Sequence, residues 1–215
     1  MVKVHLIGYG KWGAVIDNAI NDLGVKWVEP KEADWILIST PNDLHYDQVS
    51  YWLGKGKNVF CEKPLTLSYE SAKELYDFAD QMGVKLYVDD VFNWRDEAID
   101  LRPILSPEND IEVVWRRNGY KKRDLLYHDL YLLYPLLKDK LIIKWPKINN
   151  ITFDYSGSDK THTISYVDFT TTEKSNDALL EMLSHVLEDK VDYEYNRLIT
   201  IFCNKTLDSL NNIKI

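Results

Sequence analysis

The sequence predicts an α/β protein whose first part is a parallel sheet with crossover helices and whose second part is a mixed α+β domain. Short apolar runs alternate with helical patterns through residues 1–93, as in a parallel sheet covered by helices. The first of these runs ends at a glycine-rich turn that opens a helix. From about residue 94 the alternation stops, and longer helices and alternating strand patterns follow.

The elements of the first part follow from the apolar runs and their punctuation. We expect strands over residues 4–7, 25–28, 35–39, 58–61 and 84–88. Helices are expected from the glycine turn to about residue 23, over 43–53 and over 68–82. Gly24 and Gly83 suit helix C-termini. Ser68 is the expected N-cap of the third helix, although Ser71 stands where a glutamate would complete a capping box.

The second part, residues 94–215, is expected to hold a mixed and largely antiparallel sheet. A strand is predicted over 111–116, and two alternating runs, 148–155 and 161–171, flank a Ser-Gly-Ser-Asp turn that favours a hairpin. Helices are predicted over 123–137, 176–188 and 193–211. No flexible linker separates this domain from the first.

Composition excludes several classes of function. The chain has 215 residues, enough to bury a substantial core, and its hydrophobic share of 45% is ordinary for a globular protein. The net charge of −8 argues against non-specific binding to nucleic acid. No apolar run is long enough to cross a membrane, and the N-terminus lacks the features of a signal peptide. Cys61 and Cys203 are too few for a disulfide framework, so we expect a cytoplasmic protein, and no metal site is predicted.

The turn after the first strand is a complete G-x-G-x-x-G motif. Each glycine has a reason in this motif: Gly8 permits the tight turn, Gly10 lets the backbone approach a pyrophosphate, and Gly13 allows close helix–sheet packing. The N-terminus of the following helix offers unpaired N–H groups to the phosphates. The motif predicts a Rossmann-type fold over 1–93 that binds NAD or NADP, and the alternative is a glycine turn that binds nothing. The expected contacts come from Gly8, Gly10, Lys11, Trp12 and Gly13.

Glu29 is the candidate for the ribose hydroxyl groups of the cofactor. It lies 21 residues after Gly8 at the end of the second strand, and the acidic residue of this fold lies about 20 positions on. The alternative is a solvated loop glutamate before Pro30. Lys26 and Lys31 leave the choice between NAD and NADP open, with NAD slightly preferred.

Two further motifs follow the glycine turn in order. The first reads Thr-Pro-Asn-Asp-Leu-His over 40–45, and the second reads Gly-Lys-Asn-Val-Phe-Cys-Glu-Lys-Pro over 56–64, with one helix between them. Together with the glycine turn they resemble the Gfo/Idh/MocA oxidoreductases, in which all three occur in this order. The resemblance spans nearly the whole chain at reduced size. In this family two late helices pack back on the first domain.

The resemblance implies that Lys63 reaches both nicotinamide and substrate and that the Lys63–Pro64 bond is cis. A lysine at a strand end also has a direct physical case, because its ammonium stabilises charge that develops on an alkoxide oxygen. The following proline restricts the backbone that aims it. The alternative is a surface lysine before a turn. The resemblance further implies a cofactor-facing role for Thr40, Pro41, Asn42, His45, Glu62 and Pro64, with His45 otherwise packing near the helix start.

A second catalytic group is expected in the second domain, where Asp124 and His128 match the family's Asp-x-x-x-His pattern. Positions i and i+4 share one helix face. Histidine titrates near neutral pH, which suits it to take the alcohol proton, and Asp124 is expected to orient it. The alternative is an ordinary amphipathic helix. The match departs from the family at Leu126, where glycine is usual, and at Tyr131, where an acid is common and for which Asp129 is a substitute.

A larger departure lies between the second and third strands. Only residues 30–34 connect them, where the family has a helix and a further strand that help to wall the adenosine. We therefore expect an exposed adenine, a weaker affinity or a lost cofactor. A basic cluster precedes the acid–base helix and is either a solvated loop or a receptor for a phosphate; its members are Arg116, Arg117, Lys121, Lys122 and Arg123.

The sequence thus predicts an NAD(P)-dependent oxidoreductase that acts on a secondary alcohol or ketone of a sugar, polyol or related metabolite. The resemblance also implies a homodimer or homotetramer. Two other functions stay open: a reduced, non-catalytic homologue that binds a nucleotide or partner, and a lyase or hydrolase that uses tightly bound NAD transiently.

Overall fold

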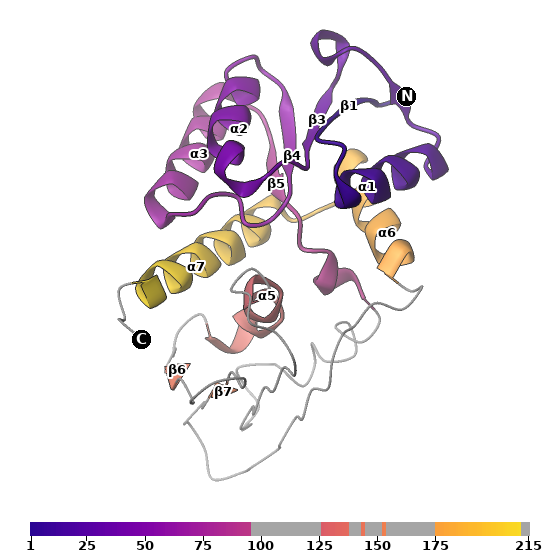
Figure 1. Cartoon of the computed structure of the whole chain (residues 1–215). Helices are drawn as coiled ribbons and strands as arrows, with labels where there is room; N and C mark the ends of the chain where they lie inside the picture. Colours follow the sequence, from indigo (N-terminus) through magenta and orange to yellow (C-terminus); the bar gives the residue numbers. More distant parts are fainter. Residues whose placement is uncertain (96–125, 138–142, 145–151, 154–174, 212–215) are drawn as a thin grey trace.

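The computed structural model describes residues 1–95, 126–137, 143–144, 152–153 and 175–211 (Figure 1). Its centre is a five-stranded parallel sheet in the order β2-β1-β3-β4-β5. The strands are β1 (Lys3–Ile7), β2 (Lys26–Trp27), β3 (Trp35–Ile38), β4 (Asn58–Cys61) and β5 (Leu86–Val88). The predicted parallel sheet is therefore confirmed. Four strands lie within their predicted ranges, and β1 begins one residue earlier than predicted.

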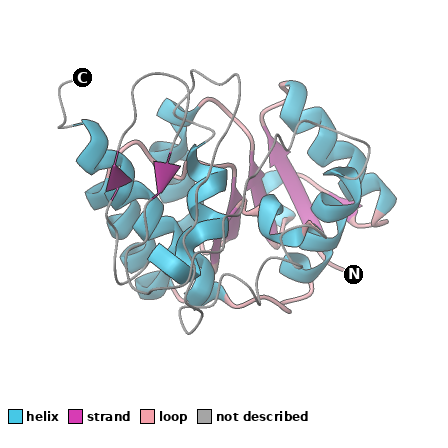
Figure 2. Cartoon of the chain, turned by 90° about the horizontal axis from the view of Figure 1, so that it is seen from below, coloured by secondary structure: helices cyan, strands magenta, loops and turns pink. Residues whose placement is uncertain are grey.

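Helices cover both faces of this sheet (Figures 1 and 2). The long helices are α1 (Lys11–Asp22), α2 (His45–Leu53), α3 (Tyr69–Met82), α5 (Leu126–Leu137), α6 (Ser175–Leu187) and α7 (Tyr193–Asn211). Three short 3-10 helices are η1 (Pro30–Glu32), η2 (Asn42–Leu44) and η3 (Val91–Trp94). The expected ends of α3 are confirmed: the Ser68 hydroxyl accepts a hydrogen bond from Ser71 N–H at 3.1 Å, and Gly83 closes the helix with a φ of 66°.

The core lies on both sides of the sheet because each parallel strand is buried on both faces. Along β3, Trp35 and Leu37 pack into one apolar cluster, and Ile36 and Ile38 pack into the other. The first cluster lies under α1 and α6, and the second lies under α2 and α3. The first cluster continues into α5 through Tyr127, so the two halves of the chain share one core. The domain boundary at residue 93 stays a prediction.

The connection between β2 and β3 is as short as the sequence indicates. It contains η1 and no α-helix, and β2 is the edge strand on that side of the sheet. The sheet therefore lacks the crossover helix and further strand that would lie beyond β2 in a full-length dinucleotide fold.

The second half is described only in part. β6 (Ile143–Lys144) and β7 (Thr152–Phe153) form a short antiparallel pair in which Ile143 lies opposite Phe153. β7 falls in a predicted alternating run, whereas β6 was not predicted. The expected strands over 111–116 and 161–171 and the expected hairpin turn lie outside the described residues. None of the helices described is both long and apolar enough to cross a membrane.

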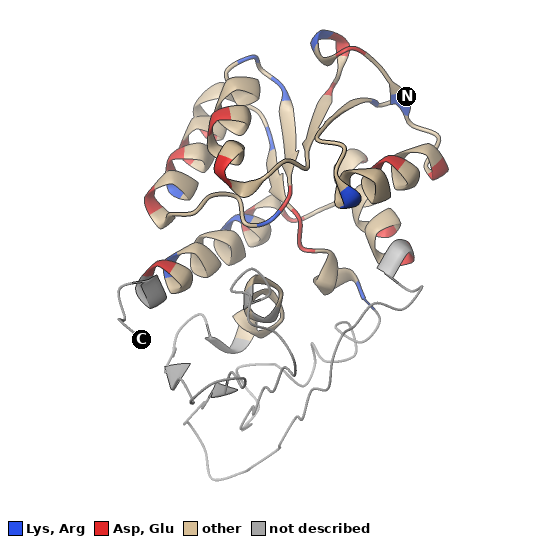
Figure 3. Ribbon diagram, in the orientation of Figure 1, with Lys and Arg blue, Asp and Glu red and all other residues tan. Residues whose placement is uncertain are grey.

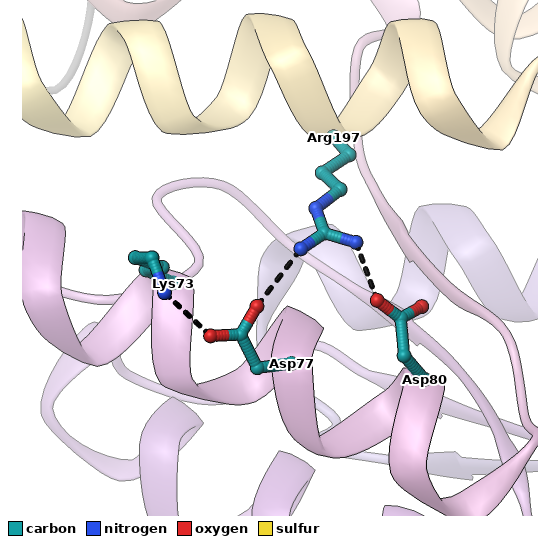
Figure 4. Close-up of polar contacts among 4 residues, drawn as sticks. All are labelled: Lys73, Asp77, Asp80 and Arg197. Carbon is teal, nitrogen blue, oxygen red and sulfur yellow. Dashed lines mark hydrogen bonds and ion pairs between the residues drawn. The ribbon is translucent and has the colours of Figure 1, made fainter.

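Helix α7 closes the exposed edge of β5 with a side chain. The amide oxygen of Asn196 accepts from Val88 N–H at 3.0 Å, and its amide nitrogen donates to the Val88 carbonyl at 2.9 Å. Asn196 is 1% exposed and thus replaces the neighbouring strand that β5 lacks on this side. One residue further along, Arg197 spans Asp77 and Asp80 of α3 at 2.9 and 2.6 Å, and Lys73 pairs with Asp77 at 2.6 Å (Figure 4).

Replacing Asn196 by alanine is expected to lower the free energy of unfolding by about 2–4 kcal/mol, because two buried backbone groups of Val88 lose their partners. Urea unfolding measures this loss. Arg197→Ala is the matched control on the same helix, and we expect a much smaller loss because its ion pairs are open to solvent. Equal effects of the two substitutions would contradict this account of the β5 edge.

Candidate functional site

The glycine turn connects the end of β1 to α1 and brings its backbone against the end of β3. Gly8 has a φ of +102°, and a Cβ there would lie 2.3 Å from the carbonyl oxygen of Ser39. A Cβ on Gly13 would lie 2.0 Å from the carbonyl oxygen of Gly8. A Cβ on Gly10 would meet no atom within 4 Å. Gly8 and Gly13 are thus required by the fold, whereas Gly10 borders open space.

The start of α1 has the character of an anion site. Gly10 is the N-cap, and no side chain caps the helix, so its first N–H groups have no side-chain acceptor. Tyr9, Lys11 and Trp12 are exposed around this turn. The open space at Gly10 and the uncapped N–H groups fit a pyrophosphate. The predicted contacts of all five turn residues with a cofactor stay predictions.

Glu29 lies near the C-terminal end of β2. It is exposed and follows β2, which runs parallel to β1 with Trp27 opposite Val4. Glu29 and Gly8 therefore lie at the same edge of the sheet, formed by the C-terminal ends of the strands.

His45 joins the two motif loops at this edge. Its Nε2 lies 2.9 Å from the Thr40 carbonyl oxygen, and its Nδ1 lies 2.8 Å from the Pro64 carbonyl oxygen. Burial lowers the pKa of His45, while the two carbonyl acceptors raise it. The ring is fully buried, so it reaches a ligand only through the loops that it holds. Thr40 also donates from its hydroxyl to Gln48 at 2.7 Å, which fixes the start of the Thr40–Asn42 segment.

Lys63 follows β4 at the same edge. Glu62 N–H bonds to the Ile38 carbonyl at 2.9 Å and continues the strand register, and the next residue is the half-buried Lys63. The Lys63–Pro64 peptide bond is cis, as the resemblance implies. Glu62 is buried next to Lys63, and the positive charge of Lys63 acts on the Glu62 carboxyl group.

Asp89 is a site residue that the sequence reasoning missed. It follows β5 and is 1% exposed, and its N–H donates to the Cys61 carbonyl at 2.9 Å, which sets it beside Glu62. Burial raises the pKa of Asp89 to about 6, and burial together with Asp89 holds the pKa of Glu62 well above its usual range. The signal was present, because an aspartate directly after a buried parallel strand lies at the edge that carries Lys63.

His128 lies on α5 and is buried against η3. Its ring stacks on Phe92 with centroids 3.8 Å apart and an interplanar angle of 27°. Asp124 lies outside the described residues, and so do the side chains of Leu126 and Asp129 and the whole basic cluster. Tyr131 is buried, with its hydroxyl 3.2 Å from that of Thr200.

The loop after Lys63 is tied to the helix that carries His128. Asn204 of α7 donates to the Thr66 and Ser68 carbonyls at 3.1 Å and accepts from the Tyr127 hydroxyl. Tyr127 precedes His128, and Thr66 lies three residues after Lys63. One buried amide therefore fixes the two segments relative to each other. Among the described residues, no group of His, Cys, Asp and Glu side chains could hold a metal ion.

A family model matches part of the first half of the chain. Residues 25–90 match the model of the Gfo/Idh/MocA oxidoreductase family, described as an NAD-binding Rossmann fold. The match begins after the glycine turn and includes the lysine motif. The candidate contacts Glu29, Thr40, Pro41, Asn42, His45, Glu62, Lys63 and Pro64 all lie within it.

Curated relatives match over parts of their length. An uncharacterized oxidoreductase of Streptococcus pneumoniae is 26% identical over 56% of this chain and 36% of its own. The 2,7-anhydro-N-acetylneuraminate hydratase of Escherichia coli is 28% identical over 45% of this chain and 27% of its own. The NADP-dependent scyllo-inositol 2-dehydrogenase of Bacillus subtilis is 31% identical over 33% of this chain and 20% of its own length. The matched region thus spans between 20% and 36% of the length of these relatives.

Solved structures share the fold over almost the whole chain. The WlbA dehydrogenase of Thermus thermophilus, solved with NAD and UDP-GlcNAcA, superposes with a TM-score of 0.75. The alignment covers 100% of this chain and 96% of that one at 15% identity. The common fold extends beyond the family-model match into the second half.

Proposed function

We propose that this chain transfers a hydride between NAD or NADP and a small alcohol or carbonyl compound. The proposal starts from residues 25–90, which match the NAD-binding Rossmann fold of the Gfo/Idh/MocA oxidoreductases. The substrate class is a secondary alcohol or ketone of a sugar, polyol or related metabolite. One observation carries the proposal. Lys63 leaves the sheet two residues after the end of β4, at the edge that also holds the open glycine turn.

Each residue has a distinct part in this proposal. The first N–H groups of α1 and the open space at Gly10 receive the pyrophosphate. Glu29 binds the ribose hydroxyl groups, and the loop after β3 borders the nicotinamide end. The nicotinamide supplies the hydride acceptor or donor at C4. The Lys63 ammonium donates a hydrogen bond to the substrate oxygen and stabilises its developing negative charge.

His128 is the proposed acid–base group. It takes the hydroxyl proton when the alcohol is oxidised and returns it when the ketone is reduced. The bond from Asn204 to the segment after Lys63 supports a shared position for the two groups. Asp124 is its proposed partner on the preceding helical turn.

Two other activities compete with this one. A lyase or hydrolase that uses tightly bound NAD transiently is favoured by the hydratase among the relatives. A non-catalytic nucleotide-binding homologue is favoured by the missing crossover, which leaves β2 at the sheet edge. NAD stays slightly preferred over NADP, and the homodimer or homotetramer stays a prediction.

A melting screen with NAD, NADH, NADP and NADPH tests the proposal. A nucleotide at 100 times its Kd is expected to stabilise the fold by about 2.7 kcal/mol, which gives a shift of several degrees. Absorbance at the nicotinamide band then follows NADH consumption with a panel of sugar and polyol ketones. Binding with net consumption supports the oxidoreductase. Retained NAD with no net redox change points to the lyase, and the lack of any shift contradicts nucleotide binding altogether.

A further inference from the structure

Two buried carboxyl groups lie side by side where β4 and β5 end. Asp89 N–H donates to the Cys61 carbonyl at 2.9 Å, so the strand register sets Asp89 next to Glu62. Glu62 is 8% exposed and Asp89 is 1% exposed, and the Asp89 carboxyl group raises the pKa of Glu62. Figure 3 shows the acidic colour of the segment that joins β5 to η3, at the centre of the molecule.

These carboxyl groups are only partly satisfied. Asp89 Oδ1 accepts from Val91 N–H at 2.8 Å. Within the described part of the chain, Glu62 Oε1 and Asp89 Oδ2 have no hydrogen-bond partner although both are buried. An unsatisfied buried carboxyl oxygen is costly, so this arrangement is not explained by stability.

The neighbouring Asp90 provides the contrast. Its carboxyl group accepts from the Tyr87 hydroxyl at 2.7 Å, from the Trp94 indole at 3.1 Å and from the Asn93 amide at 3.3 Å. Asp90 therefore serves the structure of the β5–η3 turn. Asp89 has no comparable set of donors, and its carboxyl group lies against Glu62 instead.

Electrostatics require the pair to keep one proton. Two adjacent buried carboxyl groups cannot both ionise at neutral pH, because like charges at this distance repel in a medium of low dielectric. The Asp90 carboxyl group adds to this repulsion on Asp89, whereas the positive charge of Lys63 acts on both members and favours their ionised forms. Repulsion between the two carboxyl groups is relieved when the pair keeps one proton. The negative charge that remains is stabilised by the Lys63 ammonium.

We propose that Glu62 and Asp89 form a proton-sharing carboxyl pair whose single negative charge holds the Lys63 ammonium, so that Asp89 is a positioning residue for this lysine. The proposal deepens the proposed function, since Lys63 is the reacting lysine there. The buried carboxyl pair destabilises the fold, as is common for groups held in place for function.

The first test measures the pH dependence of unfolding without any cofactor. A carboxyl group whose folded pKa is raised binds more protons in the folded state, so its stabilising effect is complete at low pH and is lost as pH rises through about 6. Asp89→Asn removes this group and keeps an oxygen acceptor for Val91 N–H. The wild-type protein is expected to lose stability relative to Asp89→Asn between about pH 4 and 7. Asp22→Asn, at an exposed position, is the control and should follow the wild type.

The second test reads Lys63 itself. Competitive acetylation followed by peptide mass spectrometry measures the reactivity of each lysine in the folded protein at fixed pH. The double variant Glu62→Gln/Asp89→Asn removes the shared negative charge and is expected to raise Lys63 acetylation about threefold or more. Each single variant keeps one carboxyl group that carries the charge, so Asp89→Asn and Glu62→Gln are expected to change Lys63 acetylation much less. The other lysines and the Asp22→Asn protein should be unchanged.

The proposal is overturned if the stability difference is flat with pH or if Lys63 reactivity is unchanged in the folded double variant. A single variant that raises Lys63 reactivity as much as the double variant would also contradict a shared charge. Both measurements are made on the full chain without nucleotide. A failure of the oxidoreductase assay therefore leaves them intact, and their failure leaves nucleotide binding intact.

Discussion

Lys63→Met is expected to lower kcat/KM by about a hundredfold or more while nucleotide binding and folding persist. The substitution keeps the length and apolar stem of the side chain and removes its charge. Loss of one preorganised donor to a developing oxyanion typically costs about 3–4 kcal/mol of transition-state stabilisation. Because Lys63 is half-buried at a strand end and not in the core, its removal leaves the packing of the sheet in place.

Steady-state kinetics with the best ketone from the nucleotide assay measures this effect. Lys63→Arg retains the charge in a different shape and is the control that separates charge from geometry. Turnover of Lys63→Met within about threefold of the wild type would refute the assignment of this lysine.

The second large effect is structural and separates two glycines of one turn. Gly13→Ala is expected to destabilise the fold by about 3 kcal/mol, because its Cβ would lie 2.0 Å from a backbone oxygen of Gly8 and the backbone must move. The expected fall in melting temperature is about 6–12 °C for a chain of this size. Gly10→Ala should cost only a few tenths of a kcal/mol, since its Cβ meets open space and its φ of −71° suits any residue. A stable Gly13→Ala protein would contradict the close approach seen here.

The fold of the first half follows from local signals. The alternating apolar runs were enough to predict the five strands, and Ser68 and Gly83 gave the ends of α3, because parallel strands buried on both faces have a strong signature. The short η1 connection was also predictable, since five residues cannot form a crossover helix and strand. The closure of β5 by Asn196 was not, because a contact across 108 residues has no local pattern.

The site was predictable where a motif carries it. Gly8, Gly10 and Lys63 belong to motifs with a defined backbone geometry, so their position at one edge of the sheet followed from the strand order. Asp89 belongs to no motif, and its importance depends on which side chain lies beside it across two strands. His45 was expected near a helix start, but its two carbonyl partners depend on the approach of two loops.

A calorimetric titration of NADH into the wild type and Gly10→Ala tests the central claim most directly. If the pyrophosphate lies over the turn between β1 and α1, a methyl group at residue 10 occupies its place. The wild type should then bind NADH, and Gly10→Ala should lose about tenfold or more in affinity at an unchanged melting temperature. Equal affinity in the two proteins, or no binding to the wild type, would contradict a nucleotide on the glycine turn.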